Sequence, residues 1–324
     1  MIFLLACGEA LPLGSTAEDC GTCHADHYAA WETSSHGTSG TSALFLALRD
    51  EAERSWGETS ARACDGCHAP GWGGDTTIGC VSCHAAIGDS GTHDGRLAVD
   101  LDAPLAGPIG DLSSPAHTSS ARGYLVEPAL CGTCHEVTGP RLFVEQTYTE
   151  HLAAETDPCV DCHAEALPDG PWVEGGRARP RHDHGFRAFS PDWETGEGQA
   201  AMLAEGLSLT VEGDEVVLAN EAGHAVPTGV AFLRSIRLDI EVGETIVDSV
   251  RLGADPVREG VPVPLITDAD AMDIFTLEAG ASVKRALPPG ATAVLRVRAL
   301  RSDVEAALGL ELPLEEEEVA RVAR

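Results

Sequence analysis

Apolar and polar residues alternate along three stretches in the last third of the chain. The stretches are 207–219, which is interrupted by a Glu-Gly-Asp-Glu turn, 236–242, and 293–299, which follows a Pro-Pro-Gly turn. Period-two alternation between turns predicts antiparallel strands that are buried on one face. We therefore expect a β-sandwich-like domain over residues 206–324, with roughly 100 residues in the sandwich.

A short helix is predicted to close this domain. Ser302 and Glu305 have the spacing of a capping box, in which the two side chains satisfy backbone amides at the start of a helix. The four consecutive glutamates at 315–318 are interpreted as a solvated helix face.

Residues 20–190 show no comparable periodicity. Up to about residue 184 this region is rich in Gly, Ser, Thr, Pro and Asp, and aromatic residues make up only 5% of the chain. Such a composition has too little apolar side chain for an ordinary core. We expect a separate, loop-rich domain with short helices, preceded by a leader and linker at 1–19 and followed by a linker at 191–205.

The pattern C-x-x-C-H occurs five times in this first domain. The copies are Cys20–His24, Cys64–His68, Cys80–His84, Cys131–His135 and Cys159–His163, and they contain ten of the eleven cysteines. A single C-x-x-C fits a zinc site, a redox dithiol or chance. Five copies, each followed by histidine, indicate one repeated chemistry.

That chemistry is covalent haem attachment. Two thiols three residues apart can add to the two vinyl groups of a porphyrin, and the following histidine can bind its iron. Zinc ribbons and disulfide frameworks are the alternatives, but neither requires a histidine after each cysteine pair. We predict five haem c groups, attached through Cys20, Cys23, Cys64, Cys67, Cys80, Cys83, Cys131, Cys134, Cys159 and Cys162, with iron bound by His24, His68, His84, His135 and His163. The domain would wrap around the stacked haems, and without them it would not fold.

Enough histidines remain to give every iron a second ligand. The chain has 13 histidines and 3 methionines. The histidines outside the motifs are His27, His36, His93, His117, His151, His182, His184 and His224. Coordination by two histidines is therefore open to all five irons, and the residues alone do not decide the pairing.

The motifs and their surroundings resemble the multihaem cytochromes c related to the tetrahaem cytochrome of nitrifying bacteria. Cytochrome c nitrite reductase and hydroxylamine oxidoreductase are more distant enzymatic relatives. The likeness rests on Y-x-x-W-x-x-S-x-H after the first motif, "CHAPGWGG", "IGCVSCH", "SPAH", "LCGTCHEV" and "GHAVPTG", and it covers most of residues 20–230. It implies that His36, His117, His184 and His224 are the distal ligands.

Two departures from the family leave the fifth distal ligand open. The last motif continues Ala164-Glu165 where the family often has Met-Pro, and His151 stands where it often has tryptophan. We rank His93 above His151 and His182 for this position. Surface roles are the alternative for these three histidines and for His27.

The net charge of −31 excludes one class of partner and favours another. The chain has 52 acidic and 21 basic residues, and its single lysine is Lys284. Phosphate binding needs the opposite sign, so nucleic acid is not expected as a partner. A redox partner protein with a basic docking surface is expected instead.

The first residues indicate export. Leu4–Cys7 resembles a lipobox, although a basic leader region is missing and the apolar run is short. We expect a periplasmic protein or a lipoprotein of the outer membrane or cell surface, associated with the membrane through lipidated Cys7. No other stretch approaches the roughly 20 apolar residues of a membrane span.

The first functional hypothesis is therefore an exported pentahaem electron carrier, an electron-transfer cytochrome of respiration rather than an enzyme. The second is an oxidoreductase that acts on a small nitrogen or sulfur compound at one open haem, although a C-x-x-C-K motif is absent. The third is a subunit of a cytochrome filament or respiratory complex, which would involve self-association.

Overall fold

The computed structural model describes residues 16–324 except 90–93, 110, 111, 113, 140, 190, 192, 194, 197 and 199. Backbone contacts divide the chain into two units. The motif unit comprises the chain up to His135 together with Asp157–Arg187, and the β unit comprises Glu136–Thr156 and Ala188–Arg324. The division differs from the predicted boundaries in two respects, because both 136–156, between the fourth and fifth motifs, and 188–205 belong with the β unit.

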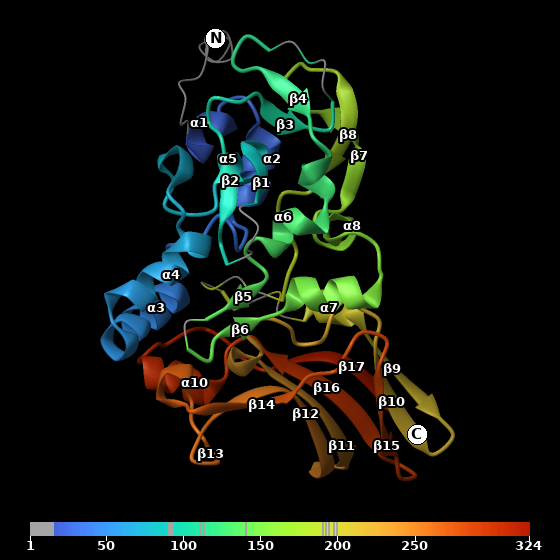
Figure 1. Cartoon of the computed structure of the whole chain (residues 1–324). Helices are drawn as coiled ribbons and strands as arrows, with labels where there is room; N and C mark the ends of the chain where they lie inside the picture. The colour runs from blue at the N-terminus through green and yellow to red at the C-terminus, as the bar shows by residue number, and fades with distance from the viewer. Residues whose placement is uncertain are drawn as a thin grey trace. The chain divides into compact units, whose positions relative to one another are not determined.

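The motif unit consists of short helices, short strands and loops (Figure 1). Its helices are α1 (Ala17–Gly21), α2 (Ala25–Glu32), α3 (Ala43–Trp56), α4 (Glu58–His68), α5 (Cys80–His84), α6 (Pro128–Gly132) and α8 (Cys159–His163). Its strands form three pairs, which are β1 (Ala86–Asp89) with β2 (Leu97–Val99), β3 (Leu105–Gly107) with β4 (Ser119–Ala121), and β7 (Ala166–Pro171) with β8 (Ala178–His182). The expected loop-rich region with short helices is confirmed.

This unit has little apolar core of its own. Among its described residues, the buried apolar side chains are mostly alanines, and only Leu44, Phe45 and Val81 are larger. Alanine contributes little buried area, so such a set stabilises a fold weakly. The polypeptide therefore has the composition expected of a shell around additional apolar material.

The β unit contains two antiparallel sheets. One sheet has the order β15 (Ser282–Ala286), β10 (Glu215–Asn220), β9 (Leu207–Glu212). The other has the order β13 (Val261–Pro262), β12 (Thr245–Arg258), β11 (Ser235–Val242), β16 (Thr292–Arg298), β17 (Glu317–Ala323), with β14 (Ala271–Phe275) also paired to β12. The unit is completed by the strand pair β5 (Val137–Thr138) and β6 (Val144–Glu145) and by the helices α7 (Thr147–Ala154), α9 (Ala201–Gly206) and α10 (Ser302–Leu308).

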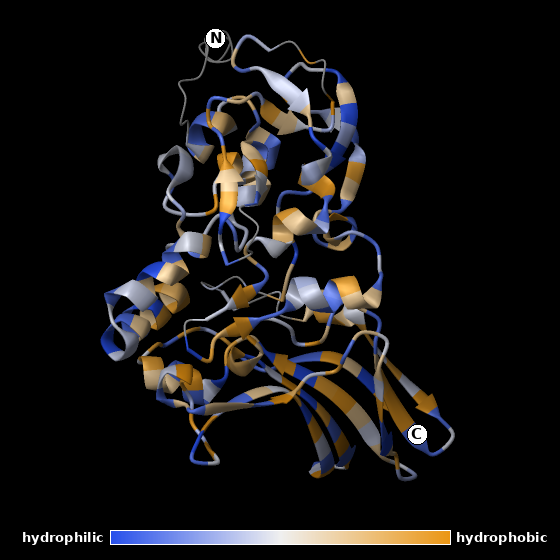
Figure 2. Ribbon diagram, in the orientation of Figure 1, coloured by the Kyte–Doolittle hydropathy of each residue, from blue (hydrophilic) through white to orange (hydrophobic). Residues whose placement is uncertain are grey.

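Both sheets contribute to one core. Leu218 of β10 shares a buried cluster with Ile236 and Leu238 of β11 and with Leu295 of β16, and each is at most 1% exposed. Figure 2 shows apolar and polar residues alternating along these strands. The three predicted strand regions are confirmed as β9 with β10, β11, and β16.

The C-terminal end differs from the prediction. Helix α10 begins at Ser302 as expected, but no capping box forms, because Glu305 instead accepts hydrogen bonds from Arg298 (2.6 Å) and from the backbone of Leu312 (2.7 Å). The glutamate run 315–318 is not helical, since it leads into β17, which pairs with β16. Glu316 lies 3.2 Å from Arg237, so cross-strand ion pairing and strand pairing outweigh the local helical preference.

None of the helices in the described part of the chain has the length and apolar character that a membrane crossing requires.

Part of the predicted linker is also ordered, because α9 occupies its last residues.

Candidate haem-binding site

Each C-x-x-C-H motif lies on or beside one turn of helix. Motif two forms the end of α4, motif three makes up α5, and motif five makes up α8. Motifs one and four begin in α1 and α6, respectively, and continue beyond the ends of these helices. In these last two motifs the histidine amide donates to the carbonyl of the first cysteine, from His24 to Cys20 and from His135 to Cys131, at 2.9 Å each. The helical bond therefore continues through every motif and presents both cysteines and the histidine on neighbouring positions of one turn.

The cysteines bring separate motifs together. Cys20 hydrogen-bonds Cys80, which joins the first motif to the third, and Cys131 hydrogen-bonds Cys159, which joins the fourth to the fifth. Nine of the ten motif cysteines form no disulfide bond. Cys23 is disulfide-bonded, and it would have to be a free thiol to form a thioether, so its assignment stays a prediction.

Four of the five motif histidines present the correct tautomer for a metal. The Nδ1 atoms of His24, His68, His84 and His163 lie 2.9, 3.3, 2.7 and 2.5 Å from the carbonyl oxygens of Trp172, Ser39, Ala106 and Arg187, respectively. A carbonyl oxygen only accepts, so Nδ1 must donate its proton and the lone pair is left on Nε2. This arrangement orients metal-binding histidines in proteins, and the residues present therefore fit axial ligation of haem iron.

Three motif histidines lie close to histidines from outside the motifs. The ring centres of His24 and His117 are 6.3 Å apart, those of His84 and His184 are 6.3 Å apart, and those of His135 and His36 are 6.4 Å apart. Two imidazoles on opposite sides of one metal ion, at metal–nitrogen distances of about 2.0 Å, have ring centres about 6.2 Å apart. The three separations match this value.

Burial favours the neutral form of these rings. Desolvation lowers the pKa of His36 to about 3, with the nearby motif histidines His135, His68 and His163 adding to the effect. Desolvation also lowers the pKa of His184 to about 4. A neutral imidazole keeps the lone pair that a metal needs.

His224 lies in the β unit, on a loop that is held by α7. Its Nδ1 lies 2.9 Å from the carbonyl oxygen of Ala225. Glu150 of α7 accepts hydrogen bonds from the amide of Ala225 (3.2 Å) and from the hydroxyl of Thr228 (2.6 Å). His151, on the same helix, is 8% exposed, so a surface role does not fit it. His93 and Cys7 lie outside the described residues.

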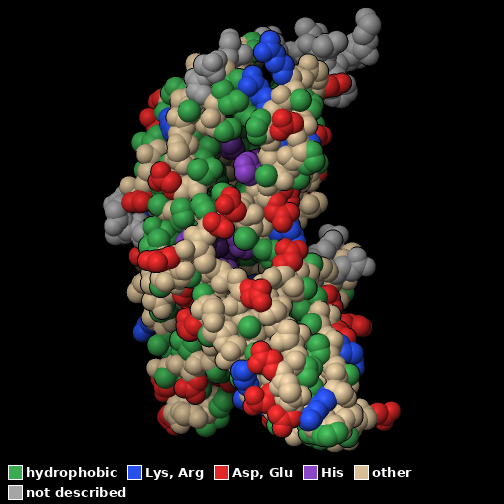
Figure 3. Space-filling model, turned by 90° about the vertical axis from the view of Figure 1, so that its right-hand side faces the viewer, with side chains coloured by type: hydrophobic (Ala, Val, Ile, Leu, Met, Phe, Trp, Pro, Cys, Tyr) green, Lys and Arg blue, Asp and Glu red, His purple; other side chains and the backbone are tan. Residues whose placement is uncertain are grey.

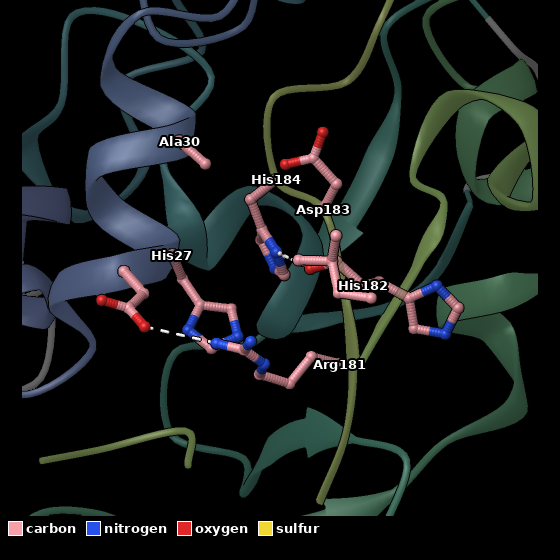
Figure 4. A pocket seen from close by; sticks show the side chains of 8 residues that line it. His27, Ala30, Arg181, His182, Asp183 and His184 are labelled. Atoms are coloured by element: carbon pink, nitrogen blue, oxygen red, sulfur yellow. Dashed lines mark hydrogen bonds and ion pairs between the residues drawn. The ribbon is translucent and has the colours of Figure 1, made fainter. Parts of the chain in front are cut away.

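A surface role is expected for His27, yet it lies among the candidate ligand histidines. Its ring centre is 4.7 Å from that of His184 and 6.0 Å from that of His24, and its buried Nδ1 has no hydrogen-bond partner. In the sequence, the feature that indicates this placement is its position three residues after His24, which puts both side chains on the same side of a helix. His27, His184 and Arg181 border one pocket (Figure 4), in which Arg181 binds Asp26 at 3.2 Å.

His182 also borders this pocket, but Figure 4 shows its ring pointing away from His184. Its Nδ1 lies 2.8 Å from the carbonyl oxygen of Ala164. His182 is exposed, which fits a surface role better than that of an axial ligand.

The fold is similar to that of a solved multihaem cytochrome c, and the five motifs have the pattern of covalent haem attachment. No family model matches the chain, and no match is found among the curated proteins. Among solved structures, the chain is similar to a penta-haem cytochrome c552 from Thermochromatium tepidum, with a TM-score of 0.70 and 18% sequence identity. The match covers 96% of this chain and 99% of the other, so the expected likeness to multihaem cytochromes c is confirmed at the level of the fold.

Proposed function

We propose that the protein is a pentahaem c-type cytochrome that carries electrons through haems ligated mainly by two histidines each. The observation that supports this most strongly is the set of three close histidine pairs, each at the ring separation expected across one iron. The similar solved structure is titled as a penta-haem cytochrome, which agrees with the five motifs here.

Each bound haem would supply a one-electron ferric/ferrous couple. The protein sets that couple through its axial ligands, burial and hydrogen bonds. Here the backbone carbonyls that accept from Nδ1 orient the motif histidines, and the surrounding side chains bury them. His224 and His93 are the proposed second ligands for the two remaining irons.

The motif contacts support electron transfer between neighbouring sites. The cysteine contacts join motif one to motif three and motif four to motif five. His36, which faces His135, also lies close enough to His68 and His163 to affect its pKa. The second, fourth and fifth motifs therefore gather around His36, as a short chain of redox centres requires.

Export and a basic redox partner remain parts of the proposal. Covalent haem attachment takes place outside the bacterial cytoplasm, and the lipobox-like start agrees with export. Figure 3 shows acidic side chains spread over the visible face, as the net charge of −31 leads one to expect. Such a surface would attract a basic partner over a distance set by the ionic strength.

Quantitative electron paramagnetic resonance (EPR) of the fully oxidised holoprotein tests this function. The proposal predicts that low-spin ferric signals account for all the haem. A high-spin signal equal to one haem per chain would contradict full bis-histidine ligation. It would favour the oxidoreductase alternative, which needs an open iron for substrate.

A further inference from the structure

One short segment touches the candidate ligands of three motifs. It is the segment 182–187, which starts at the end of β8, and it lies entirely within the motif unit. His184 faces His84 of the third motif, and the carbonyl of Arg187 accepts from Nδ1 of His163 in the fifth. Phe186 packs against His36, which faces the fourth motif.

Phe186 lies between two ligand candidates that serve different motifs. Its ring centre is 4.7 Å from that of His36, with the planes at 59°, and 5.8 Å from that of His184, with the planes at 70°. Both separations lie within the 4.5–7 Å range of tilted and edge-to-face aromatic contacts. One phenyl ring therefore contacts both imidazoles.

The backbone of Phe186 is in an unusual conformation. Its φ is +46°, in the left-handed region that bulky L-residues rarely adopt. Such strain persists only where the surroundings hold the residue in place, and it concentrates at functional sites. Glycine adopts this backbone freely, so the phenyl ring, rather than the turn, is the reason for a phenylalanine here.

We propose that Phe186 is a positioning residue that fixes the ring planes of His36 and His184 together. This inference rests on the proposed function, in which these two imidazoles are axial ligands of different irons. The phenyl ring restricts rotation of both imidazoles and keeps water out of the space between them. The orientation of axial imidazole planes determines the g-values of low-spin ferric haem, and water beside a ligand stabilises the ferric state.

The chain offers a matched comparison in Phe45. Its ring stacks on His68 of the second motif, with centres 4.5 Å apart and planes at 17°, and it is 8% exposed. Phe45 and Phe186 are thus both aromatic neighbours of candidate ligands. Phe45 contacts a motif histidine directly, whereas Phe186 contacts two distal candidates.

The test compares Phe186→Gly, Phe186→Tyr and Phe45→Leu in the holoprotein by EPR and by spectroelectrochemical titration. Phe186→Gly removes the ring and suits the backbone, and we expect it to shift the g-values of two low-spin haems and to lower their midpoint potentials. Phe186→Tyr keeps the aromatic ring, so its EPR spectrum should match that of the wild type. Phe45→Leu should change a different haem from those two.

Unchanged g-values in Phe186→Gly, with wild-type haem content, would overturn the inference while leaving bis-histidine ligation intact. If the wild-type protein itself lacks the low-spin signals, the proposed function fails first, and the two failures are thereby distinguished. Should Phe186→Gly not assemble, Phe186→Leu decides the question. It keeps apolar volume without a planar ring and should shift the same two signals.

Discussion

Glu150 is predicted to hold the loop that carries His224. Its carboxylate accepts from the amide of Ala225 and from the hydroxyl of Thr228, and both hydrogen bonds are partly buried. Burial raises the pKa of Glu150 above its ordinary value of 4.5, and these two hydrogen bonds only partly offset the shift. The negative charge of the Glu150 carboxylate therefore destabilises the fold, whereas the hydrogen bonds that its oxygens accept stabilise it.

The two functions of the side chain can be separated by substitution. Glu150→Ala leaves two hydrogen-bond donors without an acceptor. A fully buried donor without a partner costs about 1–3 kcal/mol of stability. Because the site is only partly buried, we expect a loss of about 2 kcal/mol in local stability, which corresponds to roughly thirtyfold faster exchange of the Ala225 amide. Glu150→Gln keeps an oxygen acceptor and removes the charge, so its loss should stay below about 1 kcal/mol.

The pH dependence has a definite sign. A carboxyl group whose folded pKa is raised contributes stability below its unfolded pKa, and that contribution is lost as the pH rises through the folded value. Gln does not titrate. The advantage of wild type over Glu150→Gln should therefore be largest near pH 4 and shrink toward pH 8.

Hydrogen exchange measured by mass spectrometry on peptides covering 222–229 provides the assay, and Glu136 provides the control. Glu136 accepts from the amide and the hydroxyl of Thr149, at 2.9 Å each, but in an exposed setting. Glu136→Ala removes the same two kinds of hydrogen bond. It should change the local stability that hydrogen exchange reports by less than about 1 kcal/mol. Equal effects of Glu136→Ala and Glu150→Ala, or none from Glu150→Ala, would refute the reasoning.

Four further substitutions test the core, the buried charges and the ligands. Leu238→Ala, at a core position 1% exposed, should lower the free energy of unfolding by about 2–5 kcal/mol in denaturant titrations followed by circular dichroism. Asp239→Asn should lower it by about 3–5 kcal/mol, because the fully buried carboxylate binds two arginines. Hydrogen bonds from its partners overcome the effect of burial and lower the pKa of Asp239 below 3.8, so this stabilisation should persist at neutral pH and disappear as the pH falls through the lowered value. His117→Ala should convert one low-spin haem to high-spin in EPR, whereas His182→Ala should convert none.

Local sequence information was sufficient for the strands and the motifs. Period-two alternation identified β11 and β16 because each strand buries one face, and side-chain direction follows directly from residue parity. The C-x-x-C-H motifs could be read because their chemistry fits within one helical turn. In both cases the pattern that identifies the element lies within a few residues along the chain.

Long-range contacts could not be read in the same way. Residues 136–156 join the β unit because Glu150 binds Ala225 and Thr228, more than 70 positions away, and nothing in the local pattern of α7 indicates this. Phe186 meets His36 across a still larger distance in sequence. The glutamates at 315–318 have helical propensity, but pairing with β16 places the end of the run in a strand.

The central claim is that each of the five motifs anchors one haem. The most direct test is the intact mass of the purified, fully reduced chain, combined with a pyridine haemochrome assay on the same sample. The account predicts the polypeptide mass plus five haems, retained under denaturing conditions because the thioethers are covalent. A mass that lacks one or more haems, with the corresponding cysteines found as free thiols, disulfides or zinc ligands, would contradict it.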